Sequence, residues 1–401
     1  ARKIVELREL GLPATSNNAA DIIEFLDAFV SLNRDILPCE KTTNFIGWQG
    51  KDGFLIGEEP HGNCDVAFFS DNKGEMQFVD SFGKKGTFEE WKNVIEKVRH
   101  FPAIMGALYA ALGTPLLKIL NINGFTYELA GRTSRGKTTG LRIAVSVWGN
   151  PNENSSEGDD DKTQDSLIHS WSGTRVFFER TASLLNGIPL FVDDTKTCKN
   201  PQTLADILYM IGNGRAKGRG NITGIDQTKS IRTILLSTAE TPSILATHDG
   251  GTRGRLLEVT VDPFTPKKGD EIFAIIDGRE VDDLNFAVQD NYGWAGPVFV
   301  DYILANEKNW PDWQREWREI QGQFAYSASN DGGSEVSGRL AKYAALITIT
   351  GRLAHEALGF EWDYNDPMMH LWPIVTAESA DPTGEQDCLD IGKEIHHAVC
   401  H

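Results

Sequence analysis

A glycine-rich segment carries the residues best suited to chemistry in this chain. Residues 131–138 have the pattern G-x-x-x-x-G-K-[ST] and are followed by another threonine. Such a loop surrounds phosphates with backbone N–H groups, its lysine reaches the β- and γ-phosphates, and its hydroxyl ligates Mg²⁺. We therefore expect ATP and Mg²⁺ as cofactors, with Lys137 on the phosphates and Thr138 on the metal. The residues expected to bind nucleotide are Gly131, Arg132, Thr133, Ser134, Arg135, Gly136, Lys137, Thr138 and Thr139.

Two acidic residues supply the second half of the expected site. The apolar run at residues 188–192 ends in Asp193 and Asp194. We expect Asp193 to hold Mg²⁺ together with Thr138, directly or through water. Asp194 stands where a glutamate usually polarises the attacking water. An acidic pair after a strand is also an ordinary turn signal, but its position after the glycine-rich loop favours the metal role.

The segments around these motifs predict the elements that position them. A β-prone segment at residues 124–130 precedes the glycine-rich loop and a helix follows it, which is the context this motif requires. Residues 188–194, 230–238 and 256–261 read as further strands. Apolar strands alternating with helices indicate a parallel sheet with helices on both faces, and ligands bind at the carboxyl ends of such strands. The predicted fold is therefore α/β.

Changes of pattern along the chain predict three domains. Residues 1–115 form a mixed α+β domain, residues 116–265 form the nucleotide-binding core, and residues 266–401 form a helical lid. The acidic segments at residues 149–164 and 280–283 are expected to be solvated loops. The helices expected outside the core are residues 20–33, a pair within 87–111, 270–276, 296–307, 310–327 and 335–358, and the short extended segments are 45–48, 53–56 and 66–69.

Composition limits the class of protein. The formal net charge of −18 argues against a broad DNA-binding surface but is compatible with a narrow basic channel. Five scattered cysteines form no even framework, which is typical of a reducing cytoplasm. No apolar run has membrane-spanning length, so we expect no membrane association. The chain starts at Ala1 with neither a secretion signal nor a methionine, and we expect the natural protein to continue beyond one end or both.

One strongly basic stretch follows the acidic pair. Residues 201–211 read as a helix, and the glycine-rich segment after it contains Arg215, Lys217 and Arg219. Cations spaced by glycines suit a loop that follows a phosphate backbone, so we expect these three residues to bind DNA. Two alternatives remain open: a solvated loop, or cations that touch the nucleotide of a neighbouring subunit.

Several segments taken in order resemble a known family. They are residues 47–50, 131–139, 170–174, 189–194, 209–214, 235–240, 254–256 and 291–296. Together they resemble a domain-of-unknown-function family whose members are AAA+ ATPases of phages and bacterial mobile elements. Some members are similar to minichromosome-maintenance and superfamily 3 helicases and act in replication of their element. The resemblance covers most of the chain and implies a P-loop AAA+ core.

The resemblance also implies a polar sensor between phosphate and water. In AAA+ ATPases this residue lies at the tip of the strand after the acidic pair, where Ser237, Thr238 or Glu240 could fill the place. We choose Thr238. Asp194 departs from the family pattern because the usual residue there is glutamate, which concerns the rate of hydrolysis rather than nucleotide binding.

Three arginines receive roles from the same resemblance. Arginines just before the last core strand present a finger to a neighbouring subunit, and Arg255 is the first choice, with Arg253 the second. A fixed guanidinium there would stabilise charge on the transferring phosphoryl group. Arg339 opens a lid helix and would act as a sensor 2 on the γ-phosphate. The alternative for either finger candidate is an arginine that is solvated or ion-paired at the surface.

These expectations lead to one function and two alternatives. The favoured function is a ring-forming ATPase, a homohexamer that drives single-stranded DNA through a central pore as a helicase or translocase. It would serve replication of a phage or mobile element in the cytoplasm of a bacterial or phage-infected cell. The alternatives are an AAA+ ATPase that loads or remodels a protein partner, and a slow nucleotide-gated switch.

Overall fold

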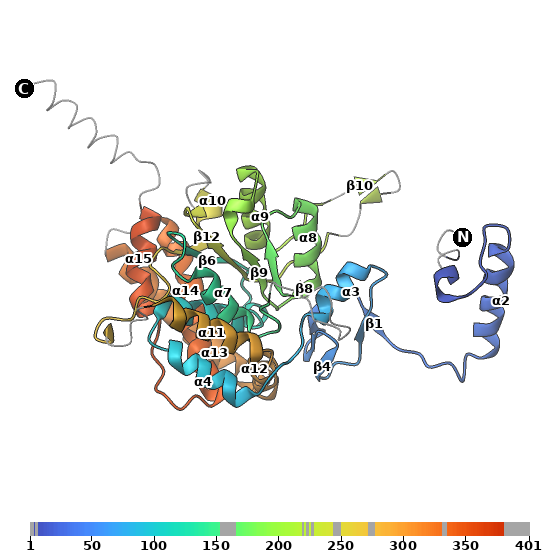
Figure 1. The fold of residues 1–401 in the computed structure, drawn as a ribbon, viewed down its shortest axis with the longest axis horizontal. Coiled ribbons are helices and arrows are strands. Elements are labelled where there is room, and N and C mark those ends of the chain that lie inside the picture. The colour runs from blue at the N-terminus through green and yellow to red at the C-terminus, as the bar shows by residue number, and fades with distance from the viewer. Residues whose placement is uncertain are drawn as a thin grey trace, which may run out of the picture. The chain divides into compact units, whose positions relative to one another are not determined.

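The computed structural model describes residues 4, 7–152, 166–218, 220–221, 224–225, 228–243, 250–271, 277–330 and 335–380 (Figure 1). The contacts divide the chain into two units, Ala1–Thr42 and Thr43–His401. The first unit contains a 3₁₀ turn, η1 (Leu7–Leu10), and helix α2 (Ala19–Leu32). The rings of Phe25 and Phe29 on α2 stack with centroids 6.3 Å apart, and both remain exposed.

A small sheet opens the second unit. Its strand order is β4-β3-β2-β8, and β8 pairs with β2 in parallel although the other pairs are antiparallel. Gly47 is required at this junction because its φ is +93° and a Cβ there would lie 2.1 Å from the carbonyl oxygen of Asn186. The strands are β2 (Ile46–Gln49), β3 (Gly53–Ile56), β4 (Glu59–Gly62) and β8 (Leu185–Asn186), and two further short strands are β1 (Thr42–Thr43) and β5 (Ala67–Phe68).

A five-stranded parallel sheet forms the centre of the second unit. Its order is β13-β6-β12-β9-β7, so the first of these strands in sequence lies between the fourth and the fifth. All four neighbouring pairs are parallel, and the carboxyl ends therefore meet at one edge. The strands are β6 (Thr126–Ala130), β7 (Ile168–Ser170), β9 (Leu190–Asp193), β12 (Leu235–Ala239) and β13 (Leu256–Val259).

Helices cover this sheet and hold it in place. Helix α5 is apolar on all sides, and its residues from Ala103 to Leu112 are all buried, as expected for a helix inside a core. The Tyr127 hydroxyl of β6 donates to the Ala103 carbonyl (2.9 Å), and the ring of Tyr343 in α14 stacks on Phe125 with centroids 4.3 Å apart. The described helices of the second unit are α3 (Lys73–Asp80), α4 (Phe88–Val98), α5 (Pro102–Leu112), α6 (Leu116–Ile119), α7 (Lys137–Val145), α8 (Arg175–Leu184), η2 (Thr195–Thr197), α9 (Pro201–Asn213), α10 (Gly250–Arg253), α11 (Gly278–Asp290), α12 (Ala295–Ala305), η5 (Glu307–Asn309), α13 (Trp310–Asn330), α14 (Glu335–Leu358) and α15 (Met368–Ala380).

The predicted mixed α/β architecture, a parallel sheet flanked by helices, is confirmed, and so are most predicted elements. One prediction is wrong: the acidic run at residues 280–283 lies in α11 rather than in a loop, because Asp277 caps the helix by accepting from the N–H groups of Arg279 and Glu280. The run is solvated all the same, since its three acids are exposed. Helix α15 was not predicted. Most of the segment at 149–164 and of the helix expected at 270–276 lies outside the described residues.

The division into domains at residues 1–115, 116–265 and 266–401 stays a prediction. Within the described ranges, no helix combines the length and the apolar character needed to cross a membrane.

Candidate functional site

The glycine-rich loop lies at the carboxyl edge of the parallel sheet, between β6 and α7. Its first residue is fixed by a hydrogen bond from the Gly131 N–H to the carbonyl of Ala239, the last residue of β12 (3.0 Å). Gly131 and Gly136 have φ values of +147° and +81°, which residues with a Cβ rarely adopt. A Cβ on Gly136 would also lie 2.4 Å from the ring of Phe264. Both glycines are therefore needed to form this loop.

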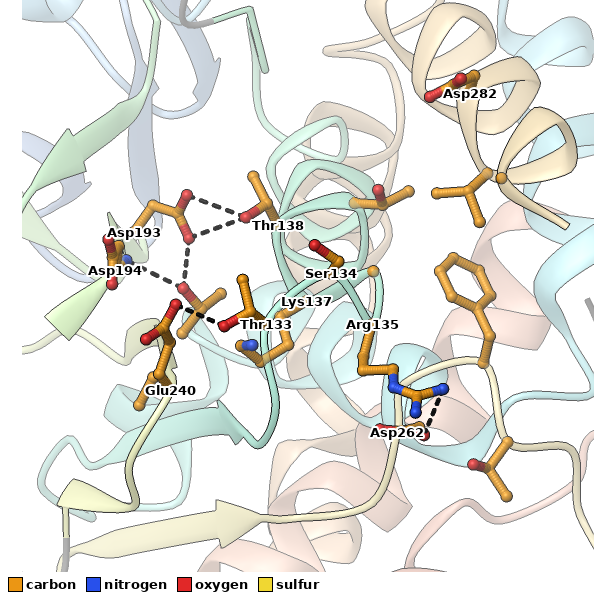
Figure 2. Close-up of a pocket in the computed structure, with 18 of the residues that line it drawn as sticks. Thr133, Ser134, Arg135, Lys137, Thr138, Asp193, Asp194, Glu240, Asp262 and Asp282 are labelled. Carbon is orange, nitrogen blue, oxygen red and sulfur yellow. Dashed lines mark hydrogen bonds and ion pairs between the residues drawn. The ribbon is translucent and has the colours of Figure 1, made fainter. Parts of the chain in front are cut away.

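A cavity of about 720 Å³ opens over the loop (Figure 2). Its size lies within the range of roughly 300–1,000 Å³ that is usual for small-molecule sites. In Figure 2, Asp193, Asp194 and Glu240 lie on one side of the loop and Asp282 lies on the other. Residues 133–139 of the predicted nucleotide set line the cavity together with Asp193, Asp194 and Thr238, whereas Gly131 and Arg132 do not.

Lys137 is held inside the loop. Its ammonium group donates to the carbonyls of Gly131 (2.9 Å) and Arg132 (2.8 Å), and the residue is only 9% exposed. A buried ammonium group needs such partners because burying an unpaired charge is costly. Its predicted role on a phosphate stays a prediction.

Asp193, at the end of β9, meets side chains from the start of α7 and the end of β12. The Thr138 hydroxyl at the start of α7 donates to its carboxylate (3.1 Å to Oδ2 and 3.4 Å to Oδ1), and the Thr238 hydroxyl donates to the same carboxylate. Thr238 also accepts from the backbone N–H of Asp194 (3.0 Å). Thr238 can reach the Asp193 carboxylate and the Asp194 backbone because β12 is the neighbour of β9 in the sheet.

The oxygens of Thr138 and Asp193 fit a magnesium ion. Mg²⁺ prefers oxygen ligands and is usually held by one or two carboxylates together with substrate phosphates and water. The described residues contain no group of three or more His, Cys, Asp or Glu side chains that could hold a metal without such help. This donor set therefore suits a metal that arrives with a phosphate ligand.

Asp194 has an unusual backbone conformation. Its φ is +56°, in the left-handed region, where aspartate and asparagine are more tolerated than most residues. Its carboxylate accepts from the backbone N–H of Lys196 (3.1 Å) and thereby caps η2. The predicted water-polarising carboxylate thus lines the cavity but is hydrogen-bonded to its own turn.

Glu240 lies just beyond the end of β12. Its Oε1 accepts from the Thr133 hydroxyl (2.8 Å), and its Oε2 pairs with the Lys196 ammonium group (3.0 Å). These two partners, the ion pair first, hold the pKa of the Glu240 carboxyl below its ordinary value. Ser237, another candidate sensor, is buried and accepts from the Trp171 indole N–H (2.8 Å). Of the three candidates, Thr238 and Glu240 line the cavity and Ser237 does not.

The far end of the cavity comes from residues that the sequence did not reveal. Phe264 and Thr265 follow β13, and Val281 and Asp282 belong to α11. Asp262 lies at this end too and forms an ion pair with Arg135 of the loop (3.7 Å) in which both side chains are about half exposed. No motif marks these positions, because the three residues after β13 reach the loop through the pairing of β13 with β6 and the two of α11 through the packing of α11 on α7.

Arg255 lies at the opposite edge of the sheet from the cavity, just before β13. Its guanidinium group donates to the carbonyl of Gly251 and to Oδ1 of Asn213 (2.8 Å), and it lies over the ring of Tyr209 at 5.1 Å from the centroid. Arg255 therefore cannot reach the cavity of its own chain. A role towards a neighbouring subunit stays a prediction.

The other two arginines also lie away from the cavity. Arg253, the second choice for the finger, is 6% exposed. Arg339 is exposed near the start of α14 and does not line the cavity. Burial lowers the pKa of Lys342, and the nearby charges of Arg255 and Arg339 lower it further. These three cations therefore share one region, and the sensor role of Arg339 stays a prediction.

The basic stretch after α9 forms one arm of a β-ribbon. Arg215 bridges Ser230 across the ribbon, and the Ala216 N–H donates to the Lys229 carbonyl (3.0 Å). Further along, β10 (Gly220–Asn221) pairs antiparallel with β11 (Gly224–Ile225), and Figure 1 shows β10 standing away from the sheet. Arg215, Lys217 and Lys229 are exposed. Arg219 lies outside the described residues, and Lys229 was not singled out in the sequence because it lies on the returning arm.

Comparisons with known proteins agree with this fold. A profile of the family described as "Domain of unknown function (DUF927)" matches residues 1–231, more than half of the chain. The chain therefore belongs to the DUF927 family. It is also similar to a solved structure described as "SCCmec type IV Cch - active helicase", with a TM-score of 0.71 and 19% sequence identity over 98% of this chain and 70% of that one. This likeness shows a shared fold. No curated protein matches the chain.

Proposed function

We propose that this protein is an AAA+ ATPase that moves along DNA as a helicase or translocase. The observation that carries the proposal is the meeting of Thr138, Asp193 and Thr238 beside a glycine-rich loop that holds Lys137. The strand expected to carry the sensor, β12, lies between β6, which leads into the loop, and β9, which ends in the acidic pair. The three-domain division at residues 1–115, 116–265 and 266–401 is part of this proposal.

The residues of this chain would share the work of hydrolysis. Mg²⁺, once bound with ATP, would neutralise charge on the β- and γ-phosphates. Thr138 and Asp193 would hold the metal, and Lys137 would exchange its loop carbonyls for phosphate oxygens. Thr238 would fix the carboxylate of Asp193 and the turn that follows it.

A ring of identical subunits would complete the site. Arg255, Arg339 and Lys342 share one region of the molecule away from their own cavity. Such a group of cations suits the phosphates of a neighbouring subunit, because a guanidinium group stabilises charge on the transferring phosphoryl. We propose a hexamer in which Arg255 serves as the finger.

The exposed ribbon would contact the DNA. Arg215, Lys217 and Lys229 are exposed on its two arms, and cations of this kind bind a phosphate backbone without regard to sequence. Six ribbons facing one axis would make a basic pore in an acidic protein. The solved structure with the similar fold is described as "SCCmec type IV Cch - active helicase", which supports a helicase role in a mobile element. We propose that this role is replication of a mobile element or phage in a bacterial cytoplasm.

A forked-DNA assay tests this function. The parent protein is expected to separate the strands in the presence of ATP and Mg²⁺, and a Lys137→Ala variant is expected not to. ATP hydrolysis without strand separation or DNA-stimulated turnover would favour a second function, an ATPase that loads or remodels a protein partner. The net charge of −18 favours that alternative.

A further inference from the structure

The cavity holds three carboxylates on the side of the metal residues, and they are engaged differently. Asp193 accepts from two threonine hydroxyls. One of them belongs to Thr138, the other expected ligand of the metal, so this carboxylate suits the metal. Asp194 is in the left-handed region and caps the turn that follows it. Glu240 reaches across to the glycine-rich loop itself. A carboxylate that acts on a water beside the γ-phosphate must lie near this loop.

Two bonds fix Glu240 relative to the loop. The backbone N–H of Gly131 donates to the carbonyl of Ala239, the residue before Glu240 (3.0 Å). The Thr133 hydroxyl donates to the Glu240 carboxylate (2.8 Å). The first bond fixes the backbone next to Glu240, and the second fixes the direction of its side chain. The loop therefore sets both.

We propose that Glu240, rather than Asp194, is the carboxylate that orients and deprotonates the attacking water. This inference rests on the proposed ATPase function and names the catalytic residue of that same site. In the step, the water oxygen forms a bond to the γ-phosphorus while the bond from that phosphorus to the bridging oxygen breaks. The products are ADP and inorganic phosphate. The water proton passes to the Glu240 carboxylate and from there to the released phosphate.

Lys196 is a positioning residue in this scheme. Its ammonium group pairs with Oε2 of Glu240 (3.0 Å), while its backbone N–H donates to Asp194 (3.1 Å). One residue thus holds both candidate carboxylates, and its two bonds orient them differently. The backbone bond keeps Asp194 on its own turn, and the side-chain bond keeps Glu240 beside the loop.

The experiment compares Glu240→Gln with Asp194→Asn in the full chain. Single-turnover ATP hydrolysis and the affinity for a fluorescent ATP analogue are measured for both. Glu240→Gln is expected to slow hydrolysis by about 100-fold or more while the affinity changes little, because removing a general base usually costs 10²–10⁴-fold. Asp194→Asn is expected to lose less than about tenfold, since asparagine tolerates the left-handed region and keeps the capping oxygen.

Two further variants separate catalysis from loop anchoring. Thr133→Val removes the hydroxyl that donates to Glu240 and leaves the Glu240 carboxylate in place. Lys196→Met removes only the ion pair with Glu240. Both are expected to hydrolyse ATP faster than Glu240→Gln. A loss in Thr133→Val equal to that in Glu240→Gln, with equal affinity, would mean that Glu240 only anchors the loop, and the inference would be wrong.

The comparison with Asp194 gives the other decisive result. If Asp194→Asn loses 100-fold or more and Glu240→Gln hydrolyses like the parent protein, the catalytic carboxylate is Asp194. Failure of the proposed function looks different, because a parent protein that neither binds nor hydrolyses ATP removes the ATPase itself.

Discussion

The hydroxyl of Thr138 donates to the carboxylate of Asp193 at 3.1 Å, although 55 residues separate them in the chain. Thr138 lies on the first turn of α7, and Asp193 ends β9, two strands away from β6. This direct contact joins the two halves of the expected metal site, Thr138 and Asp193. It also makes the role of each half testable on its own.

The first prediction concerns this metal pair. Asp193→Asn is expected to lose about 100-fold or more of its Mg²⁺-dependent turnover, because the metal would lose its charged support. Some nucleotide affinity should remain, since Lys137 and the loop are intact. A Mg²⁺ titration of ATP hydrolysis, alongside nucleotide binding, checks this. Parent-like turnover at every Mg²⁺ concentration would remove Asp193 from the site.

The second prediction concerns Lys137. A ligand present at 100 times its Kd stabilises the folded state by about 2.7 kcal/mol, so ATP should raise the Tm of the parent protein. Lys137→Ala should lose most of this rise because it removes the positive charge that would contact the β- and γ-phosphates. Lys73→Ala is the matched control, since Lys73 is exposed on α3 and does not line the cavity. An unchanged rise in the Lys137 variant contradicts the site.

The third prediction concerns the finger in trans. Arg255→Ala is expected to bind ATP but to lose turnover, by on the order of 10³-fold if it acts like other arginine fingers. Because Arg255 also bonds to Asn213 and Gly251, a thermal melt must show that the variant is folded. Mixing it with Lys137→Ala should restore part of the activity, since some interfaces would pair an intact loop with an intact finger. No recovery in rings shown to mix would refute the assignment.

The fourth prediction concerns the basic ribbon. Replacing Arg215, Lys217 and Arg219 together by alanine should weaken single-stranded DNA binding and flatten its salt dependence, by about 0.7 in log–log slope per lost phosphate contact. Lys229→Ala should act in the same direction. Basal hydrolysis should stay near the parent level while DNA-stimulated hydrolysis falls.

A matched control for the ribbon replaces three exposed lysines elsewhere. Lys73, Lys97 and Lys308 are exposed and lie outside the ribbon. Their triple alanine variant should keep the salt slope of the parent protein. If the ribbon variant instead loses basal turnover and keeps its DNA affinity, the ribbon cations act on a neighbour's nucleotide.

The fifth prediction concerns the pH dependence of stability. Glu128 on β6 is fully buried opposite Glu258 on β13, and burial raises its pKa to about 7 against the opposing effect of its bonds from Ser243. A carboxyl whose pKa is raised on folding contributes stability that is present below its unfolded pKa and lost as the pH rises through the folded pKa. The free energy of unfolding should therefore fall between about pH 4.5 and pH 7, by up to the order of 3 kcal/mol. Denaturant unfolding across this range checks it.

Two variants make the pH prediction specific. Glu128→Gln cannot ionise, so its stability should depend less on pH across this window. Glu90→Gln is the control because Glu90 is exposed on α4, and this variant should keep the parent dependence. Identical curves for all three proteins would mean that Glu128 does not titrate in the window.

Local sequence was enough to predict the position of the glycine-rich loop and the strands around it. The loop is contiguous, its glycines are required by backbone conformations that other residues rarely adopt, and the strand before it and the helix after it have their own patterns. The place of Asp193 at the end of β9 was predictable for a similar reason, because it ends an apolar run. Each of these features depends on residues within a few positions of one another.

Only the tertiary structure decided which side chains face the cavity together. Alternation along β12 places Ser237 and Thr238 on opposite faces, but it does not say which face is which. The strand order does, because β12 between β6 and β9 brings Thr238 to Asp193 and leaves Ser237 with Trp171. The bond from Thr133 to Glu240 spans 107 residues. Contacts of this range depend on packing and strand order, which local sequence does not encode.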